Sequence, residues 1–156
     1  MLLYLASTLY HASKDEEKRI KLRIFDHAAI YILIAGTYTP VCLISLKETV
    51  GTILLISIWS IALAGVILKL FYTGRFDRAS TVLYVLMGWI AIFAVQPLIE
   101  ALSNPPLLWL LAGGVCYTTG AVIYSIKSIS FNHAIFHVFV LGGSTCHYLM
   151  IYWYII

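Results

Sequence analysis

His133 and His137 lie near the start of an apolar segment, residues 131–156, that contains no Lys, Arg, Asp or Glu. If this segment is a helix, the spacing of four residues places both imidazoles on one face, about one turn apart. Two imidazoles in this arrangement can bind a single metal ion, as they do in the zinc-binding helices of metalloproteases. The pair therefore indicates metal chemistry, and a complete site needs further ligands from elsewhere in the chain.

Other polar groups are expected at the same depth as this pair. His11 ends an apolar segment directly before the charge run KDEEKRIKLR, and Asp26 lies in the first turn of the next apolar segment. Three histidines with an open fourth position are a known catalytic zinc arrangement, and a nearby carboxylate can hold or activate a bound water. We therefore predict a zinc site with His11, His133 and His137 as ligands and Asp26 facing the water. Ser7 repeats the four-residue spacing relative to His11.

Each of these residues also has a simpler interpretation. A histidine in a membrane helix often only hydrogen-bonds a neighbouring helix. Asp26 could interact with the dipole of its own helix, and Ser7 could donate to a carbonyl of its own helix. His27 is about 100° round its helix from Asp26, so we expect it to be structural. His147 lies about 15 Å further along its helix than His137 and cannot join the site.

The elements that position these residues are expected to be membrane helices. Of the 156 residues, 62% are hydrophobic and 11% are charged, whereas about 25% of the residues of a soluble domain are charged. Runs without acidic or basic residues approach or exceed the roughly 20 residues that span a bilayer. We expect an all-α polytopic transmembrane bundle, a single integral membrane domain over 1–156. Its predicted spans are 24–46, 50–70, 79–99, 106–125 and 131–154, with a partial span at 1–13.

The distribution of Lys and Arg predicts the orientation of this bundle, because these residues favour cytoplasmic loops. Alternate connections are basic, and their residues are Lys14, Lys18, Arg19, Lys21 and Arg23, then Lys69, Arg75 and Arg78, then Lys127. The other two connections hold Lys47, Glu48 and Glu100. We therefore expect the basic connections to be cytoplasmic, the C-terminus to lie on the outer side, and the plasma membrane to be the location.

The N-terminal segment is too short for a full span. Thirteen residues of helix reach about 20 Å, whereas the hydrocarbon core is about 30 Å thick. We expect that residues 1–13 belong to a helix of which the preceding part is missing from this sequence.

The composition argues against one function, nucleic-acid binding, and the cysteine spacing argues against one kind of metal site. The net charge is only +3, and the basic residues lie in loops, so nucleic-acid binding is not expected. Cys42, Cys116 and Cys146 share no short spacing, which argues against a cysteine-based zinc motif.

Three segments together resemble the signature segments of the hemolysin III family, within the progestin-and-adipoQ-receptor superfamily. They are STLYH (7–11), FDHAAIYILIAGTYTP (25–40) and NHAIFHVFVLGGSTCHY (132–148). The resemblance implies seven transmembrane helices and a zinc ion near the cytoplasmic face. It implies His11, His133 and His137 as zinc ligands, Asp26 in contact with the metal through water, and Ser7 as a polar partner in the site. The first helix and the outer half of the second, which the family has, are absent from this sequence.

Several functions are compatible with such a site. The first is a zinc-dependent hydrolase of lipid amides or esters, similar to the distantly related alkaline ceramidases, with the acyl chain of the substrate between the helices. The second is a pore-forming, cytolytic protein, although the spans lack a ring of ionisable residues to line a pore. The third is a receptor or membrane sensor in which zinc only joins three helices. A fourth is a haem protein with His11 facing His133. The sequence does not determine the oligomeric state.

Overall fold

The computed structural model describes residues 2–46, 48–73 and 77–156, and all regular structure within these ranges is helical. The α-helices are α1 (Leu2–Ala12), α2 (Glu16–Pro40), α3 (Glu48–Tyr72), α4 (Asp77–Gly88), α5 (Val95–Ala101), α6 (Asn104–Ser125) and α7 (Asn132–Tyr154). Within the described residues, five helical stretches are long and apolar enough to cross a membrane. The expectation of an all-α polytopic bundle is therefore confirmed.

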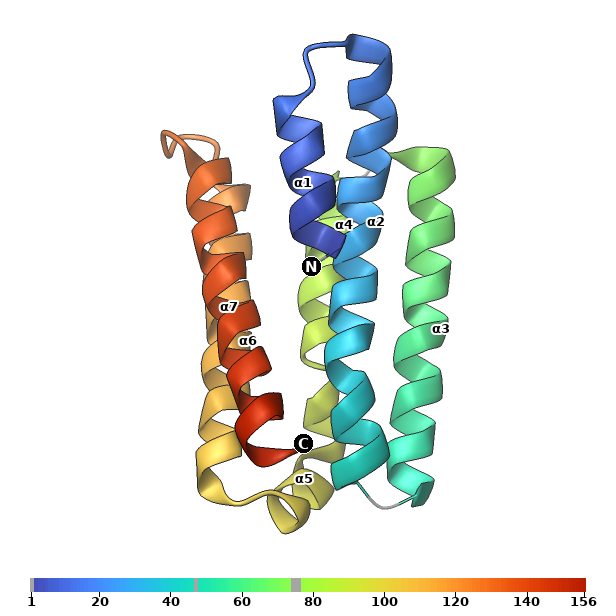
Figure 1. Ribbon diagram of the computed structural model, residues 1–156, viewed down its shortest axis with the longest axis vertical. Helices are drawn as coiled ribbons and strands as arrows, with labels where there is room; N and C mark the ends of the chain where they lie inside the picture. Colours follow the sequence, from blue (N-terminus) through green and yellow to red (C-terminus); the bar gives the residue numbers. More distant parts are fainter. Residues whose placement is uncertain (1, 47, 74–76) are drawn as a thin grey trace.

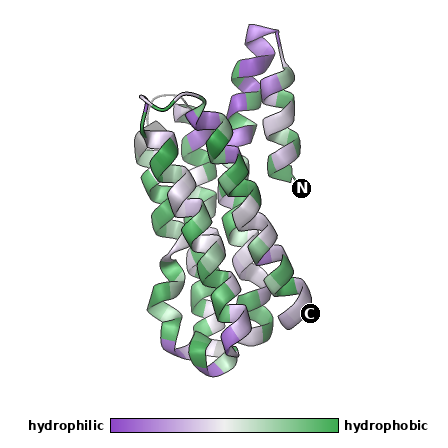
Figure 2. Cartoon of the chain, turned by 90° about the vertical axis from the view of Figure 1, so that its left-hand side faces the viewer, coloured by the Kyte–Doolittle hydropathy of each residue, from purple (hydrophilic) through white to green (hydrophobic). Residues whose placement is uncertain are grey.

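Long helices that follow one another along the chain run in opposite directions, close to the vertical axis of Figure 1. The α1–α2 and α6–α7 connections lie at one end of the bundle, and the α5–α6 connection lies at the other. Hydrophilic residues concentrate at the α1–α2 end, where α2 extends beyond the apolar body of the bundle (Figure 2). This arrangement brings the start of α7 to the same end as the end of α1. Lys47 and Arg75, which the sequence places in loops, lie outside the described residues.

Helix α2 begins at Glu16, earlier than the expected span 24–46, and takes in most of the charge run. Asp15 caps it: one carboxylate oxygen accepts hydrogen bonds from the backbone N–H of Glu17 and of Lys18 at 3.1 and 3.2 Å. Lys21 then pairs with Glu17 at 3.2 Å, one turn along the exposed face. The N-terminal cap and the first-turn acids stabilise this start, so polar residues that look like a connection form a helix.

The other end of α2 changes to a π-helical turn, Val41–Ser45, directly after Pro40. Proline lacks an N–H and its ring crowds the carbonyl of the preceding turn, which favours such irregularities. The first turns of α3 pack against this segment at Gly51, where a Cβ would come within 2.2 Å of the Cys42 carbonyl oxygen. The small residue therefore permits the close approach of the two backbones.

The expected helix 79–99 is interrupted. Helix α4 ends at Gly88, and a 3₁₀ segment, Ile90–Ala94, precedes α5. Pro97 contributes to this break, because its ring is incompatible with a regular α-helical turn before it. The hydroxyl of Tyr38 on α2 donates to the Gly88 carbonyl at 2.6 Å and accepts from the Ala91 N–H at 3.1 Å. A side chain from another helix thus satisfies backbone groups that the break exposes.

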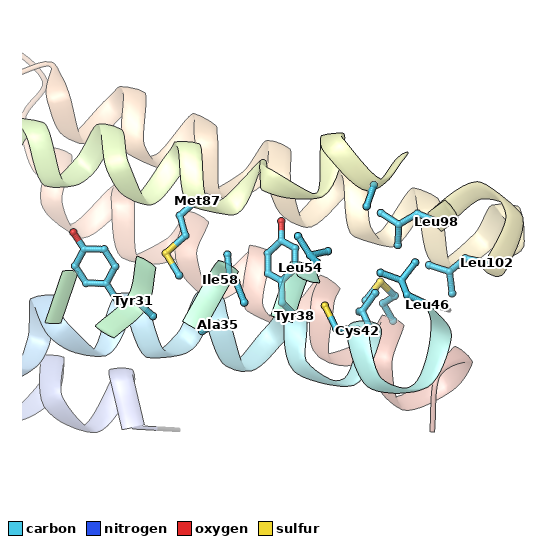
Figure 3. Packing of buried hydrophobic residues seen from close by; sticks show 14 residues of the cluster. Tyr31, Ala35, Tyr38, Cys42, Leu46, Leu54, Ile58, Met87, Leu98 and Leu102 are labelled. Atoms are coloured by element: carbon cyan, nitrogen blue, oxygen red, sulfur yellow. The ribbon is translucent and has the colours of Figure 1, made fainter. Parts of the chain in front are cut away.

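A core of buried side chains joins α2, α3, α4 and α5 along the length of the bundle. Tyr31, Ala35 and Tyr38 follow one another on the inner face of α2, and Cys42 of the π-helical turn continues the row, as Figure 3 shows. Opposite them, α3 contributes Leu54, Ile58 and Ala62. Alanines and glycines at such contacts let membrane helices approach closely, so dispersion contacts accumulate without a hydrophobic driving force from water.

Gly65 of α3 provides a test of this packing. A Cβ at this position would come within 2.3 Å of the Tyr31 ring, which is 1% exposed and therefore cannot easily move. We expect Gly65→Ala to lower the free energy of unfolding by about 1–3 kcal/mol, as overpacking does. The measurement is thermal unfolding of the protein in detergent.

Gly36→Ala is the matched control, because nothing lies within 4 Å of the added Cβ. In a helix interior this change should leave stability unchanged or raise it by up to about 1 kcal/mol. Equal melting temperatures for the two variants would contradict the packing of Tyr31 on Gly65.

Candidate metal centre

Helix α1 is held between α2 and α7 by a small apolar cluster. Its buried members are Leu3, Ala6, Ala29 and Val140, with Tyr117 and Phe136 packed against them. The hydroxyl of Tyr4 also donates to the Val140 carbonyl at 3.4 Å. These contacts fix the side of α1 that faces α7, so the next turns of α1 present Ser7 and His11 toward the first turns of α7.

Three imidazoles converge at this point. The Nε2 atom of His133 lies 3.0 Å from Nε2 of His11 and 2.9 Å from Nε2 of His137. Candidate ligand atoms of the three residues all lie within 4.8 Å of one another. His11 is exposed, whereas His133 and His137 are half-buried. The structure therefore brings together the three histidines that the sequence predicts as ligands.

Hydrogen bonding alone does not account for this convergence. An imidazole nitrogen carries either one N–H or one in-plane lone pair. Nε2 of His133 therefore cannot make a full hydrogen bond to both neighbours. A cation between the three nitrogens would use all three lone pairs at once.

The spacing also suits a small divalent ion. Zn–N bonds of about 2.0–2.1 Å at tetrahedral angles place ligand nitrogens about 3.3 Å apart, close to the separations present here. A set of three imidazoles favours zinc or another imidazole-binding transition metal over magnesium or calcium. The haem alternative fits poorly, because 3.0 Å between Nε2 of His11 and Nε2 of His133 leaves no room for a macrocycle between them.

Asp26 on α2 lies beside the three histidines. It is 5% exposed, hydrogen-bonds the Ser7 side chain, and lies within electrostatic range of His11 and His133. The Ser7 hydroxyl is also 3.5 Å from Nε2 of His137. Ser7 thus links the carboxylate to the histidine cluster, and every residue that the sequence singles out for the site is present around it.

His27 and His147 are not part of the cluster of three histidines, although both line the cavity next to it. The backbone carbonyl of His27 accepts a hydrogen bond from Tyr84 on α4 at 3.0 Å. The His147 ring packs against α6 where Gly113 leaves space, with Nε2 3.1 Å from the Leu110 carbonyl oxygen. His147 therefore joins α6 to α7 in the middle of the bundle.

A cavity of about 110 Å³ extends from the histidine cluster into the bundle. Asp26, His133 and His137 line it at one end, and apolar side chains from α2, α4, α6 and α7 form most of its wall. Lys69 of α3 also lines the cavity, although the sequence suggests a residue flanking a loop. Its place in the last turn of α3, three residues before Tyr72, does not distinguish a buried lysine from one at the membrane surface.

Comparison with known proteins places the chain in a family. Residues 1–148 match the family described as haemolysin-III related. The chain belongs to this family. It is 46% identical to Hemolysin-3 of Bacillus cereus over 155 residues, which cover 99% of this chain and 71% of that protein. It is 47% identical to the Hemolysin-3 homolog of Bacillus subtilis (strain 168) over 154 residues, covering 99% of this chain and 72% of that protein.

More distant relatives extend beyond bacteria. The human monocyte to macrophage differentiation factor is 27% identical over 162 residues, covering 98% of this chain and 66% of that protein. No solved structure matches the chain. Family membership and the apolar helices together establish an integral membrane protein of the haemolysin-III-related family.

The metal ligands can be tested by substitution. We expect His137→Ala to lose bound metal, because two imidazoles remain where three converged. His147→Ala should retain the metal, because that ring lies against Leu110 and Gly113. The measurement is the metal-to-protein ratio of purified protein by mass spectrometry.

Loss of α6–α7 packing could lower the yield of His147→Ala, so the ratio is taken on the monodisperse fraction only. Equal metal content in the two variants would contradict the assignment of His137 as a ligand.

Proposed function

We propose that this protein is a zinc-dependent hydrolase that cleaves an amide or ester of a membrane lipid. The observation that carries the proposal is the position of Asp26, a buried carboxylate beside three convergent imidazoles at the end of an apolar cavity. A hydrolase needs a carboxylate that can act as a base and a cavity that can hold its substrate, and both lie beside these histidines.

When bound at the three histidines, zinc supplies Lewis acidity for a scissile carbonyl and makes water a stronger nucleophile near neutral pH. In this proposal the Asp26 carboxylate accepts a proton from the attacking water as the new C–O bond forms. The same proton then passes to the leaving amine or alkoxide as the C–N or C–O bond breaks. The Ser7 hydroxyl, which hydrogen-bonds Asp26, keeps the carboxylate oriented toward the histidine cluster.

The cavity supports a lipid as the substrate class. Its wall beyond the histidines includes Ile30, Leu33 and Ile34 of α2 and Phe136 and Val140 of α7. An alkyl chain buried there exchanges one apolar environment for another, so a lipid could present its carbonyl to the site without its chain entering water. Ceramide-like amides combine such a chain with a scissile amide bond.

The names of the bacterial relatives, Hemolysin-3 and Hemolysin-3 homolog, favour a second candidate, lysis of membranes. Haemolysis by the purified protein would support it, and the metal-free His137→Ala variant separates the two functions. A lytic pore would persist in that variant, whereas lysis caused by lipid hydrolysis would be lost with the metal.

Asp26 provides the main test of hydrolysis. Asp26→Asn removes the base but keeps a side chain that can hydrogen-bond water, so metal content should change little. Hydrolysis of a ceramide or a comparable lipid amide should fall by about 10²–10⁴-fold, the range for loss of general-base catalysis. The measurements are metal content and release of free fatty acid.

Glu17→Gln is the matched acid-to-amide control, because Glu17 lies on the exposed face of α2. It should change neither quantity. Unchanged hydrolysis in Asp26→Asn would refute the role of Asp26 as a base, and complete loss of metal would show that Asp26 is itself a ligand.

We also propose that the histidine end of the bundle faces the cytoplasm, with the C-terminus on the outer side of the plasma membrane. The basic residues at the α1–α2 and α6–α7 connections support this orientation. Single cysteines at Lys18 and Lys127 should react with an impermeant thiol reagent only after the cell is opened. A cysteine at Asn104 should react in intact cells. Labelling of Lys127 and Asn104 from the same side would contradict the orientation, because α6 separates them.

A further inference from the structure

Two cysteines that the proposed hydrolysis does not use lie together where α6 packs on α7. The thiol of Cys146 on α7 hydrogen-bonds the thiol of Cys116 on α6, and both cysteines are free. The Sγ atom of Cys116 also lies 3.8 Å from the position that a Cβ on Gly142 would take. Cys146 follows Gly142 by four residues and is therefore its neighbour on the same face of α7. Two contacts thus place the Cys116 thiol against this face of α7.

The packing of the two helices, which lie side by side in Figure 1, holds these thiols near one level. Glycines let side chains of the opposite helix approach closely at three successive contacts. These contacts are Gly113 with His147, Tyr117 with Gly143, and Gly120 with Phe139. By this register the residue of α7 level with Cys116 is Ser144, which precedes Cys146 by an axial offset of about 3 Å. A disulfide between the two cysteines therefore needs side-chain rotation and no sliding of one helix along the other.

The pair lies near the middle of both helices and is open to the surroundings. Helix α6 runs from Asn104 to Ser125 and α7 from Asn132 to Tyr154, so neither cysteine is close to a helix end. Both cysteine side chains are partly exposed, and the residue before each of them is exposed. In a bundle that spans a membrane, groups exposed at this depth contact hydrocarbon. Reagents dissolved in lipid therefore reach thiols that ions in water do not.

The lipid surroundings favour a redox partner whose reaction leaves no charge behind. Apolar surroundings disfavour a thiolate, and an isolated charge is costly in hydrocarbon. A quinone accepts two electrons and two protons together. In its reaction with a dithiol, the two S–H bonds break, one S–S bond forms, and the quinone becomes the hydroquinone. Every reactant and every product of this reaction is uncharged, so it suits a dithiol in the middle of a membrane.

We propose that Cys116 and Cys146 form a redox-active dithiol that a quinone dissolved in the membrane oxidises to a disulfide. The disulfide joins α6 covalently to α7, the helix that carries His133 and His137. This covalent modification site goes beyond the proposed hydrolysis, because it requires neither a metal nor turnover of a lipid. The observation that carries it is the contact between the two thiols at a face open to lipid.

The test uses duroquinone, whose four methyl groups leave no free ring position for a thiol to add to. Reduced wild-type protein in lipid vesicles is mixed with duroquinone under nitrogen. We expect one hydroquinone per protein, measured by its absorbance. Of the three cysteine thiols of the chain, one should remain, counted on a denaturing gel after reaction with a maleimide polymer. Ferricyanide, an anion that lipid excludes, should leave all three.

Three variants identify the thiols that react. Cys116→Ala and Cys146→Ala should each lose hydroquinone formation. Cys42→Ala is the matched control, because Cys42 lies in the core beside α3 and is 3% exposed, and it should form as much hydroquinone as the wild type. Oxidation should raise the melting temperature of the wild type and of Cys42→Ala by about 7–15 °C, as expected for a disulfide that closes a loop of about 30 residues. It should leave the melting temperatures of the other two variants unchanged.

Three results would overturn the inference. The first is wild-type protein that keeps all its thiols in excess duroquinone, a result that needs no variant to fold. The second is hydroquinone formation that persists in Cys116→Ala or Cys146→Ala, because a different thiol would then be oxidised. The third is a disulfide-linked dimer on a non-reducing gel in place of the internal bond, because the thiols would then react between molecules.

Discussion

The rest of the structure depends on the convergence of three imidazoles, in which Nε2 of His133 lies at hydrogen-bonding distance from Nε2 of both His11 and His137. Nε2 of His133 lies 3.0 and 2.9 Å from its two neighbours and cannot satisfy both by hydrogen bonding. Such a cluster persists only where helix packing holds the rings together or a cation joins them. The packing of α1 against α2 and α7 holds the rings together. The three imidazole nitrogens are also suitable ligands for a cation.

The site consequently depends on small residues far from the histidines. Gly65 admits the Tyr31 ring and fixes α2 against α3, and Gly113 admits the His147 ring and joins α6 to α7. Lipid offers no hydrophobic drive for helix association, so close packing and interhelical hydrogen bonds carry this task. The Tyr38 hydroxyl is an example of such an interhelical hydrogen bond: it bridges the backbone groups of Gly88 and Ala91 where the helix breaks.

Sequence patterns predict the number of long helices and the meeting of the three histidines. The charge-free runs locate the membrane spans, and the position of each polar residue within its span then gives its depth in the membrane. The patterns do not predict the start of α2, since the cap formed by Asp15 makes a charged segment helical. The break after Gly88 is also missed, because it depends on a hydroxyl from α2. The inward position of Lys69 is missed for a similar reason: it follows from the register that Tyr31 and Gly65 set, and a hydropathy pattern contains no such information.

We propose that three histidines and an oxygen ligand bind a transition metal in this bundle, and an X-ray absorption spectrum of the purified protein at the zinc edge tests this proposal. We expect scattering from nitrogen and oxygen at about 2.0–2.1 Å, with the multiple-scattering features of three imidazoles. We expect no sulfur at about 2.3 Å, although Cys42, Cys116 and Cys146 form no disulfide and carry free thiols. A sulfur shell, or purified protein without stoichiometric metal, would contradict the claim.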